Sequence, residues 1–269
     1  MPLAHVSSAE TLVWTARLTA LSVAIQAAEL LQVRAAFRED GCFAWSLLRR
    51  DFASSPMWLQ RSLDALLSYR PFVALLLVQL SGALALPWLS SAAWSFMLLL
   101  TVLLVCLRFR GTYNGGSDSM TIVVLLGLTV SRLAAQLHAS DAWVDAGLGY
   151  IAAQLVLSYF VAGLAKLRQR TWQSGQALSQ LVQVRQYVVP RPLVALLSKP
   201  WASRLTGWLA IGFECAFPAA LLMGRGVAFF LLALAASFHV AIALAFGLNR
   251  FLWAWLSAYP ALWYWSQRT

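Results

Sequence analysis

The sequence predicts an all-α polytopic transmembrane bundle of about eight membrane helices with several short interfacial helices. Of its 269 residues 61% are hydrophobic and only 11% are charged, whereas a soluble domain carries about 25% charged residues. The chain contains apolar runs of about 17–25 residues, the length that crosses a bilayer. Its 13 tryptophans suit the interfacial belts of membrane proteins.

The apolar runs place the membrane helices along the chain. No alternating β-barrel pattern appears, and a single segment in lipid satisfies its own backbone hydrogen bonds only as a helix. The predicted spans are 9–33, 71–88, 91–108, 119–137, 143–167, 204–223, 226–246 and 249–266. We expect them to form one transmembrane domain over residues 1–269.

Two polar stretches between the spans are predicted to lie in the membrane interface. Residues 44–50 and 59–67 have the pattern of short amphipathic helices, and residues 177–182 are mildly amphipathic. Three prolines, Pro190, Pro192 and Pro200, then interrupt the chain before the sixth span.

The net charge of +10 has a topological meaning in such a chain. The basic residues lie between apolar spans, so they indicate orientation and contacts with anionic lipid rather than a nucleic-acid partner. With eight spans, 16 of the 20 Lys and Arg fall on one face, Arg225 and Arg268 on the other, and Arg17 and Arg132 within spans. The positive-inside rule then makes the basic face cytoplasmic and places both termini outside.

No metal site is predicted. The three cysteines, Cys42, Cys106 and Cys215, show neither a CxxC pair nor a spacing with histidine that would favour zinc or a disulfide framework. The sequence also shows no phosphate-binding glycine loop and no nucleophile elbow.

Polar residues inside the predicted spans are the candidate functional residues, because lipid makes their burial costly. Lys166 ends the fifth span on the basic face. Glu214 lies about 15 Å into the sixth span, and His239 lies past the middle of the seventh, nearer the same face. The fourth span opens on that face with Asn114, Ser117 and Asp118. Four helices therefore predict a pocket in the inner half of the membrane, open to the cytoplasm.

Plainer interpretations of these residues stay open at this point. Lys166 is long enough to extend to the lipid headgroups. Glu214 and His239 are also explained as neutral groups hydrogen-bonded between helices. Residues 111–118 fit a turn followed by a helix N-cap. Arg17 and Arg132, in the outer parts of their spans, are expected to pair or to extend to the interface.

Two runs of residues resemble a known family. Residues 159–167, which end with Lys166-Leu167, followed by Trp172 and Gly175, are similar to the signature of the HTTM proteins. This is the membrane-domain family of vitamin K-dependent gamma-carboxylase. The run from Phe238-His239 to Pro260-Ala261-Leu262 resembles its second signature, and Glu214 with Pro218 fits the segment between. The resemblance covers about residues 70–266.

The resemblance implies a chemistry for the candidate residues. The carboxylase oxidises a reduced quinone with oxygen, which yields a strong base that removes a proton from a glutamate side chain. By this resemblance Lys166 is expected to act as an acid or base, or to stabilise an anionic quinone oxygen. His239 and Glu214 are expected to support it or to relay protons. The expected substrate-binding residues are Asn114, Ser117, Asp118, Tyr159 and Trp172, and a quinone is the implied cofactor.

Three functions remain open from the sequence. The first is a membrane enzyme that modifies a peptide or lipid-soluble substrate at Lys166. The second is a non-catalytic partner of a peptide toxin or another subunit, because the chain also resembles the compact bacterial HTTM protein that helps to mature a sporulation-delaying toxin. The third, a transporter, is disfavoured because no inverted repeat appears. We expect the bacterial cytoplasmic (inner) membrane as the location.

Overall fold

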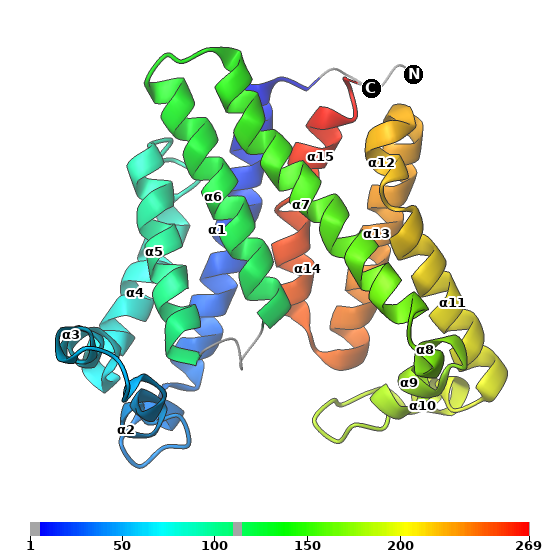
Figure 1. The fold of residues 1–269 in the computed structure, drawn as a ribbon, viewed down its shortest axis with the longest axis horizontal. Coiled ribbons are helices and arrows are strands. Elements are labelled where there is room, and N and C mark those ends of the chain that lie inside the picture. The colour runs from blue at the N-terminus through cyan, green and yellow to red at the C-terminus, as the bar shows by residue number, and fades with distance from the viewer. Residues whose placement is uncertain (1–5, 110–114, 269) are drawn as a thin grey trace. The chain divides into compact units, whose positions relative to one another are not determined.

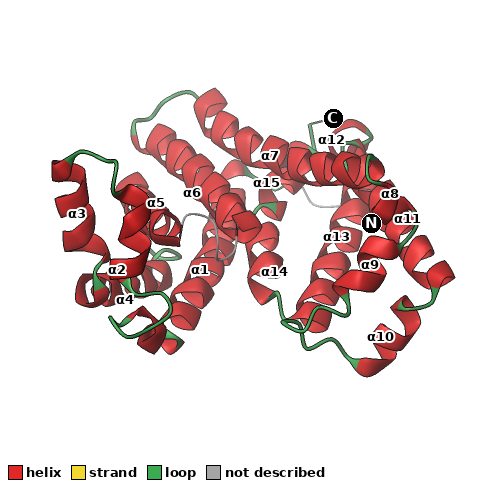
Figure 2. Ribbon diagram, turned by 60° about the horizontal axis from the view of Figure 1, so that its bottom comes forward, coloured by secondary structure: helices red, strands yellow, loops and turns green. Residues whose placement is uncertain are grey.

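The computed structural model describes residues 6–109 and 115–268, and within these ranges it contains helices and loops but no strand (Figure 2). The all-α prediction is confirmed. The chain divides into two compact units. Residues 12–147 form what we call the N-terminal unit, and residues 148–269 with the first eleven form the C-terminal unit. The single domain over residues 1–269 stays a prediction.

The N-terminal unit is built on four long helices. They are α1 (Ser8–Gln32), α4 (Tyr69–Ala85), α5 (Ala92–Phe109) and α6 (Gly115–Gln136), and α5 packs along α6 (Figure 1). Between α1 and α4 lie the short elements η1 (Arg34–Phe37), α2 (Trp45–Leu48), η2 (Arg49–Phe52) and α3 (Met57–Leu67). The predicted interfacial stretches 44–50 and 59–67 are therefore helical.

Arg108, a residue of α5, links these short elements to that helix through hydrogen bonds. The charge pattern assigns Arg108 to the basic surface, but its side chain is buried, with 1% of the residue exposed. Its guanidinium donates hydrogen bonds to the carbonyl oxygens of Leu67 and of Phe43, the latter at 2.9 Å, and lies 4.3 Å from the centre of the Phe72 ring. A charged donor therefore satisfies two carbonyl oxygens of the segment between α1 and α4, one before α2 and one at the end of α3.

Buried polar groups also join α1, α4 and α6. The Gln79 amide donates to the Gln26 carbonyl oxygen at 2.7 Å, and the Gln26 amide donates to the Asp118 carboxylate at 2.7 Å. Arg132 donates to the backbone oxygen of Leu89 and to the Ser95 hydroxyl, both at 2.9 Å. Within the unit, Asp118 and Arg132 are thus held by partners, as buried polar groups require.

The C-terminal unit contains most of α7 (Asp141–Leu167) and every later helix (Figure 1). Its other long helices are α11 (Pro200–Ala216), continued by α12 (Ala219–Leu222), and α13 (Gly224–Phe246). Two short helices, α14 (Asn249–Leu256) and α15 (Tyr259–Trp265), end the chain. Residues 168–199, which we call the cap, link α7 to α11 through α8 (Arg170–Gln173), α9 (Gln176–Leu181) and α10 (Arg191–Leu197).

The prediction of eight membrane spans is wrong by the length and composition of the described helices. Five qualify, namely α5, α6, α7, the segment 200–222 and α13, and a sixth is added if α3 and α4, bent by 64°, form one span. The predicted span 9–33 is helix α1, but its buried side carries Thr15, Thr19 and Gln26, which lower its mean hydropathy. The predicted span 249–266 is interrupted before Pro260 and forms helices of 8 and 7 residues.

We predict that Arg108→Leu lowers the free energy of unfolding by about 2–4 kcal/mol, because two buried carbonyl oxygens lose a charged donor. Thermal unfolding in mild detergent, followed by tryptophan fluorescence, measures this loss. The control is Arg70→Leu, which makes the same chemical change at an exposed position of α4. If the two variants are equally stable, the hydrogen bonds of Arg108 do not stabilise the fold as we infer.

Candidate functional site

The candidate site begins where α7 and α11 approach closely at Gly163. A Cβ atom at Gly163 would lie 2.8 Å from the Cys215 backbone nitrogen and 2.9 Å from the Glu214 Cβ. Real Cβ atoms do not approach other heavy atoms so closely, so only glycine allows this contact. The glycine brings the last turn of α7, which carries Lys166, beside Glu214 on α11.

Lys166 and Glu214 form an ion pair at this crossing. The Lys166 ammonium donates to both carboxylate oxygens of Glu214, at 2.7 Å and 2.6 Å. The Glu214 side chain is 3% exposed and that of Lys166 is 19% exposed. Trp172 covers the lysine, with the ammonium 5.3 Å from the centre of its ring. A carboxylate this deeply buried needs such a partner to remain charged.

The turn between Trp172 and Gly175 is set by the backbone of Gly175. Its φ of +83° is unfavourable for residues with a Cβ atom, and a Cβ there would lie 2.4 Å from the Arg204 nitrogen. The turn therefore docks on the first turns of α11 while Trp172 reaches back to Lys166 at the end of α7. This geometry accounts for the tryptophan and the glycine in that pattern.

A second polar cluster lies among α7, α13 and α15. The hydroxyl groups of Tyr159 and Tyr259 are 3.0 Å apart, and the His239 Nε2 is 2.8 Å from the Tyr159 hydroxyl. The His239 ring also lies over Trp255, with centroids 5.1 Å apart, and its buried Nδ1 has no hydrogen-bond partner among the described residues. The cluster is a short buried hydrogen-bond chain that ends at an unsatisfied nitrogen.

Aromatic rings fill the space between the two clusters. The Phe213 ring lies 5.5 Å from Tyr159 and 5.8 Å from Phe238, and the Phe217 ring lies 4.0 Å from Tyr159. Phe213 and Phe217 flank Glu214 along α11. The ion pair and the Tyr159–His239 cluster are therefore neighbours in one aromatic interior, although no hydrogen bond joins them among the described residues.

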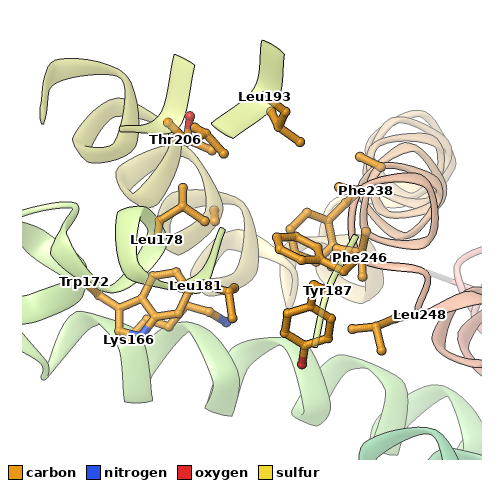
Figure 3. A pocket seen from close by; sticks show the side chains of 15 residues that line it. Lys166, Trp172, Leu178, Leu181, Tyr187, Leu193, Thr206, Phe238, Phe246 and Leu248 are labelled. Carbon is orange, nitrogen blue, oxygen red and sulfur yellow. The ribbon is translucent and has the colours of Figure 1, made fainter. Parts of the chain in front are cut away.

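An apolar cavity of about 340 Å³ opens beside Lys166 (Figure 3). Trp172 and Leu181 line it near the lysine, and Phe238, Tyr187 and Leu248 stand opposite (Figure 3). The remaining lining residues come from the cap, α11 and α13, and are Leu178, Leu193, Leu197, Thr206, Ala210, Ala241, Ile242, Ala245 and Phe246. Lys166 is the charged residue of this lining, so the cavity suits an apolar molecule with one polar group.

The site offers two chemical capacities. A lysine ammonium has three N–H donors, and Glu214 receives two of them, so one is left without an acceptor among the described residues. That donor can bind an oxygen of a ligand in the cavity. Glu214 is within reach to accept a proton from Lys166 or to return one, because their atoms already share short hydrogen bonds.

The structure places the described site residues of the prediction in three groups. Lys166, Glu214 and Trp172 meet in one cluster of the C-terminal unit, and His239 meets Tyr159 in the other. Ser117 and Asp118 belong to the N-terminal unit, where Asp118 binds Gln26. Asn114 lies outside the described residues. No group of three or more His, Cys, Asp or Glu side chains that could hold a metal is found in residues 6–109 and 115–268.

Sequence reasoning missed several residues of the site. Tyr259, which completes the buried chain with Tyr159, directly precedes the proline of the second family signature. Tyr187 packs edge-on against Phe246, with ring centroids 5.3 Å apart, and both line the cavity. Tyr187 lies in a segment that carried no motif, and Phe246 lies between the two quoted parts of the second signature. Only the folding of the cap over α13 brings these two rings together.

We predict that Gly163→Ala destabilises the protein by about 1–3 kcal/mol, because the added methyl group forces α7 and α11 apart. The matched control is Gly212→Ala on α11, where an added Cβ meets no atom within 4 Å. Alanine favours a helix over glycine, so the control variant should be as stable as the parent or slightly more so. Melting temperatures in the same detergent compare the two. A harmless Gly163→Ala would disprove the close contact.

Comparison with known proteins gives one match. The family model of the HTTM domain matches residues 136–266, close to half of the chain. The matched region contains the ion pair, the Tyr159–His239 cluster and the cavity. No curated protein and no solved structure matches the chain.

Proposed function

From the premise that residues 136–266 of this membrane protein are an HTTM domain, of the carboxylase-related family, we propose that the chain binds and modifies a lipid-soluble substrate beside Lys166. The observation that carries the proposal is the position of Lys166. It stands at the wall of an apolar cavity of about 340 Å³, a volume within the range of ligand pockets, and it is held there by a buried carboxylate.

The charge of the site defines what can enter the cavity. Lys166 and Glu214 neutralise each other, so a neutral ligand leaves the pair balanced, whereas a free anion would add uncompensated charge to an apolar interior. The unused N–H of Lys166 favours a ligand that presents an oxygen acceptor. An apolar molecule with a carbonyl or hydroxyl oxygen meets both conditions.

A quinone, which the family resemblance implies, fits these residues. Trp172, Tyr187 and Phe246 supply aromatic walls for a flat ring, and Lys166 supplies a donor for a ring oxygen. A bound quinone would supply the redox chemistry. Lys166 would hold the ring oxygen, Glu214 would exchange a proton with Lys166, and the apolar walls would exclude water from both.

A non-catalytic role is the second candidate, and one observation favours it. Lys166 and Glu214 satisfy each other without any ligand, as a structural ion pair between α7 and α11 would. In that case the chain would serve as a membrane partner of a peptide or another subunit, and the ion pair would only hold the helices together.

We predict that Lys166→Met lowers the retention of a quinone by the purified protein at least tenfold, because the ring oxygen loses its charged donor. The protein in mild detergent is incubated with a menaquinone carrying a short isoprenoid tail and is analysed by native mass spectrometry. Lys199→Met is the control, because it makes the same change at the other lysine, which is exposed and outside the cavity. The parent protein and the control should keep the quinone, and the amount of quinone bound to Lys166→Met should be at least tenfold lower.

A double variant separates a loss of quinone binding from a loss of folding. Removing one partner of a buried ion pair destabilises a protein by about 3–5 kcal/mol, so Lys166→Met with Glu214→Gln removes both charges together. If this folded double variant still retains the quinone, the proposed role of Lys166 is wrong. A bound peptide or partner protein without quinone, unchanged by either variant, would establish the second candidate.

The proposal includes an orientation in the membrane. The amide of Val6 donates to the Gln267 side chain at 2.8 Å, and this contact supports placing both ends of the described chain on the same side of the membrane. Arg225 also binds Gln267, at 3.2 Å. The cap, with Arg168, Arg170, Arg185, Arg191 and Lys199, lies at the other end of α11 and α13 and carries no acidic residue. The positive-inside rule supports a cytoplasmic cap and outside termini, in a bacterial inner membrane.

Reporter fusions test this orientation. We predict that alkaline phosphatase fused after Thr269 is active in a bacterial host, because the enzyme matures its disulfides only outside the cytoplasm. The same reporter inserted after Val188 of the cap should be inactive, and a fluorescent protein should give the opposite pattern. If the phosphatase in the cap is active, the proposed orientation is wrong, and the cap and its cavity lie on the outer side of the membrane.

A further inference from the structure

A groove on the surface of the C-terminal unit lies apart from the cavity. It has a volume of about 490 Å³ and runs between the end of α8 and the first turns of α11. Its lining consists of Ser174, Pro200, Trp201, Arg204, Leu205 and Trp208, none of which lines the cavity. We call it the Arg204 groove.

Arg204 is the charged residue of this groove, and its charge is not neutralised within the described part of the chain. Its side chain is exposed and makes no hydrogen bond or ion pair there. The surrounding sequence adds to the positive potential, because residues 167–213 contain six basic residues and no Asp or Glu. The six are exposed, and they are Arg168, Arg170, Arg185, Arg191, Lys199 and Arg204. An anionic partner complements this surface.

The flanks of the groove are apolar and aromatic. Trp201 is 62% exposed and Trp208 is 42% exposed, which is typical of rings that lie at the level of lipid headgroups. The Trp208 indole donates to the Gln173 carbonyl oxygen at 3.2 Å, which fixes its orientation. Leu205 and Leu209, 52% and 64% exposed, continue the apolar surface along α11 away from Arg204.

The position of Arg204 is fixed by the fold. The positive φ of Gly175 places that residue against the Arg204 backbone, where even a single added Cβ would lie 2.4 Å from the Arg204 nitrogen. The guanidinium therefore extends from a backbone that is already held in place. Binding at such a position loses little conformational entropy of the backbone.

We propose that the Arg204 groove binds an anionic phospholipid, with the phosphate at the Arg204 guanidinium and the acyl chains along Leu205 and Leu209. A guanidinium suits a phosphate because its N–H groups match two phosphate oxygens. A phospholipid accounts for the exposed leucines as well as for the charge, whereas an acidic peptide would account for the charge alone. The bound lipid would hold the Trp172–Gly175 turn at the membrane surface.

The test uses lipid nanodiscs of phosphatidylcholine mixed with phosphatidylglycerol. The full-length protein is released from the nanodiscs, and its retained lipids are counted by native mass spectrometry. We expect the parent to retain phosphatidylglycerol in preference to phosphatidylcholine. Arg204→Gln should reduce this retention about tenfold or more, because the phosphate loses its charge-assisted hydrogen bonds to the guanidinium.

Arg185→Gln is the matched control, since it removes one exposed charge from the same basic segment outside the groove. Unchanged retention in this control together with the loss in Arg204→Gln supports a defined site. Equal losses in both variants would mean diffuse charge attraction and would overturn the proposal, as would a parent that shows no preference for phosphatidylglycerol. Lys166→Met should retain the lipid, so this result does not depend on the chemistry proposed for the cavity.

Discussion

The Glu214 carboxylate constrains the packing of the C-terminal unit. Its side chain is only 3% exposed, and a charge buried this deeply is stable only beside a partner of opposite charge. Lys166 supplies that partner from α7, and Gly163 allows the two helices to come close enough. Trp172 then covers the lysine and shields the pair from the cap side. The helix crossing at Gly163, the turn that carries Trp172 and one wall of the cavity all meet at this ion pair.

The same constraint shapes the N-terminal unit with different residues. Arg108 is surrounded by aromatic rings and bound to two carbonyl oxygens, and Asp118 is joined to Gln79 through Gln26. In each case the polar group faces the protein interior and apolar side chains face outward. Part of helix α1 shows this arrangement, with Thr15 and Thr19 buried and Trp14 exposed, whereas Arg17 of the same helix is exposed. Lipid accepts the apolar side, and the polar side finds hydrogen-bond partners inside.

The cap has two surfaces with different chemistry. Its inner side chains, such as Leu178, Leu181 and Tyr187, complete the cavity. Its outer side is basic and meets the first turns of α11, where Arg204 and two tryptophans form the groove. Gly175 lies at the junction, since its backbone docks on α11 while the preceding turn presents Trp172 to Lys166. The cap, which has no long helix, is thus held against α11 at position 175, where only glycine fits.

The sequence by itself determined the fold class, the positions of α5, α6, α7 and α13, and the choice of Lys166, Glu214 and His239 as residues to examine. Long apolar runs and the isolated polar residues within them are local features, so they can be found in the amino-acid sequence without the structure. The tertiary structure decided which polar groups meet. Glu214 lies 48 residues from Lys166 along the chain and meets it across α7 and α11, and Asp118 accepts a hydrogen bond from Gln26 within the N-terminal unit. It also fixed where each helix begins and ends, and by the length and composition of those described helices five qualify as spans, or six if α3 and α4 form one.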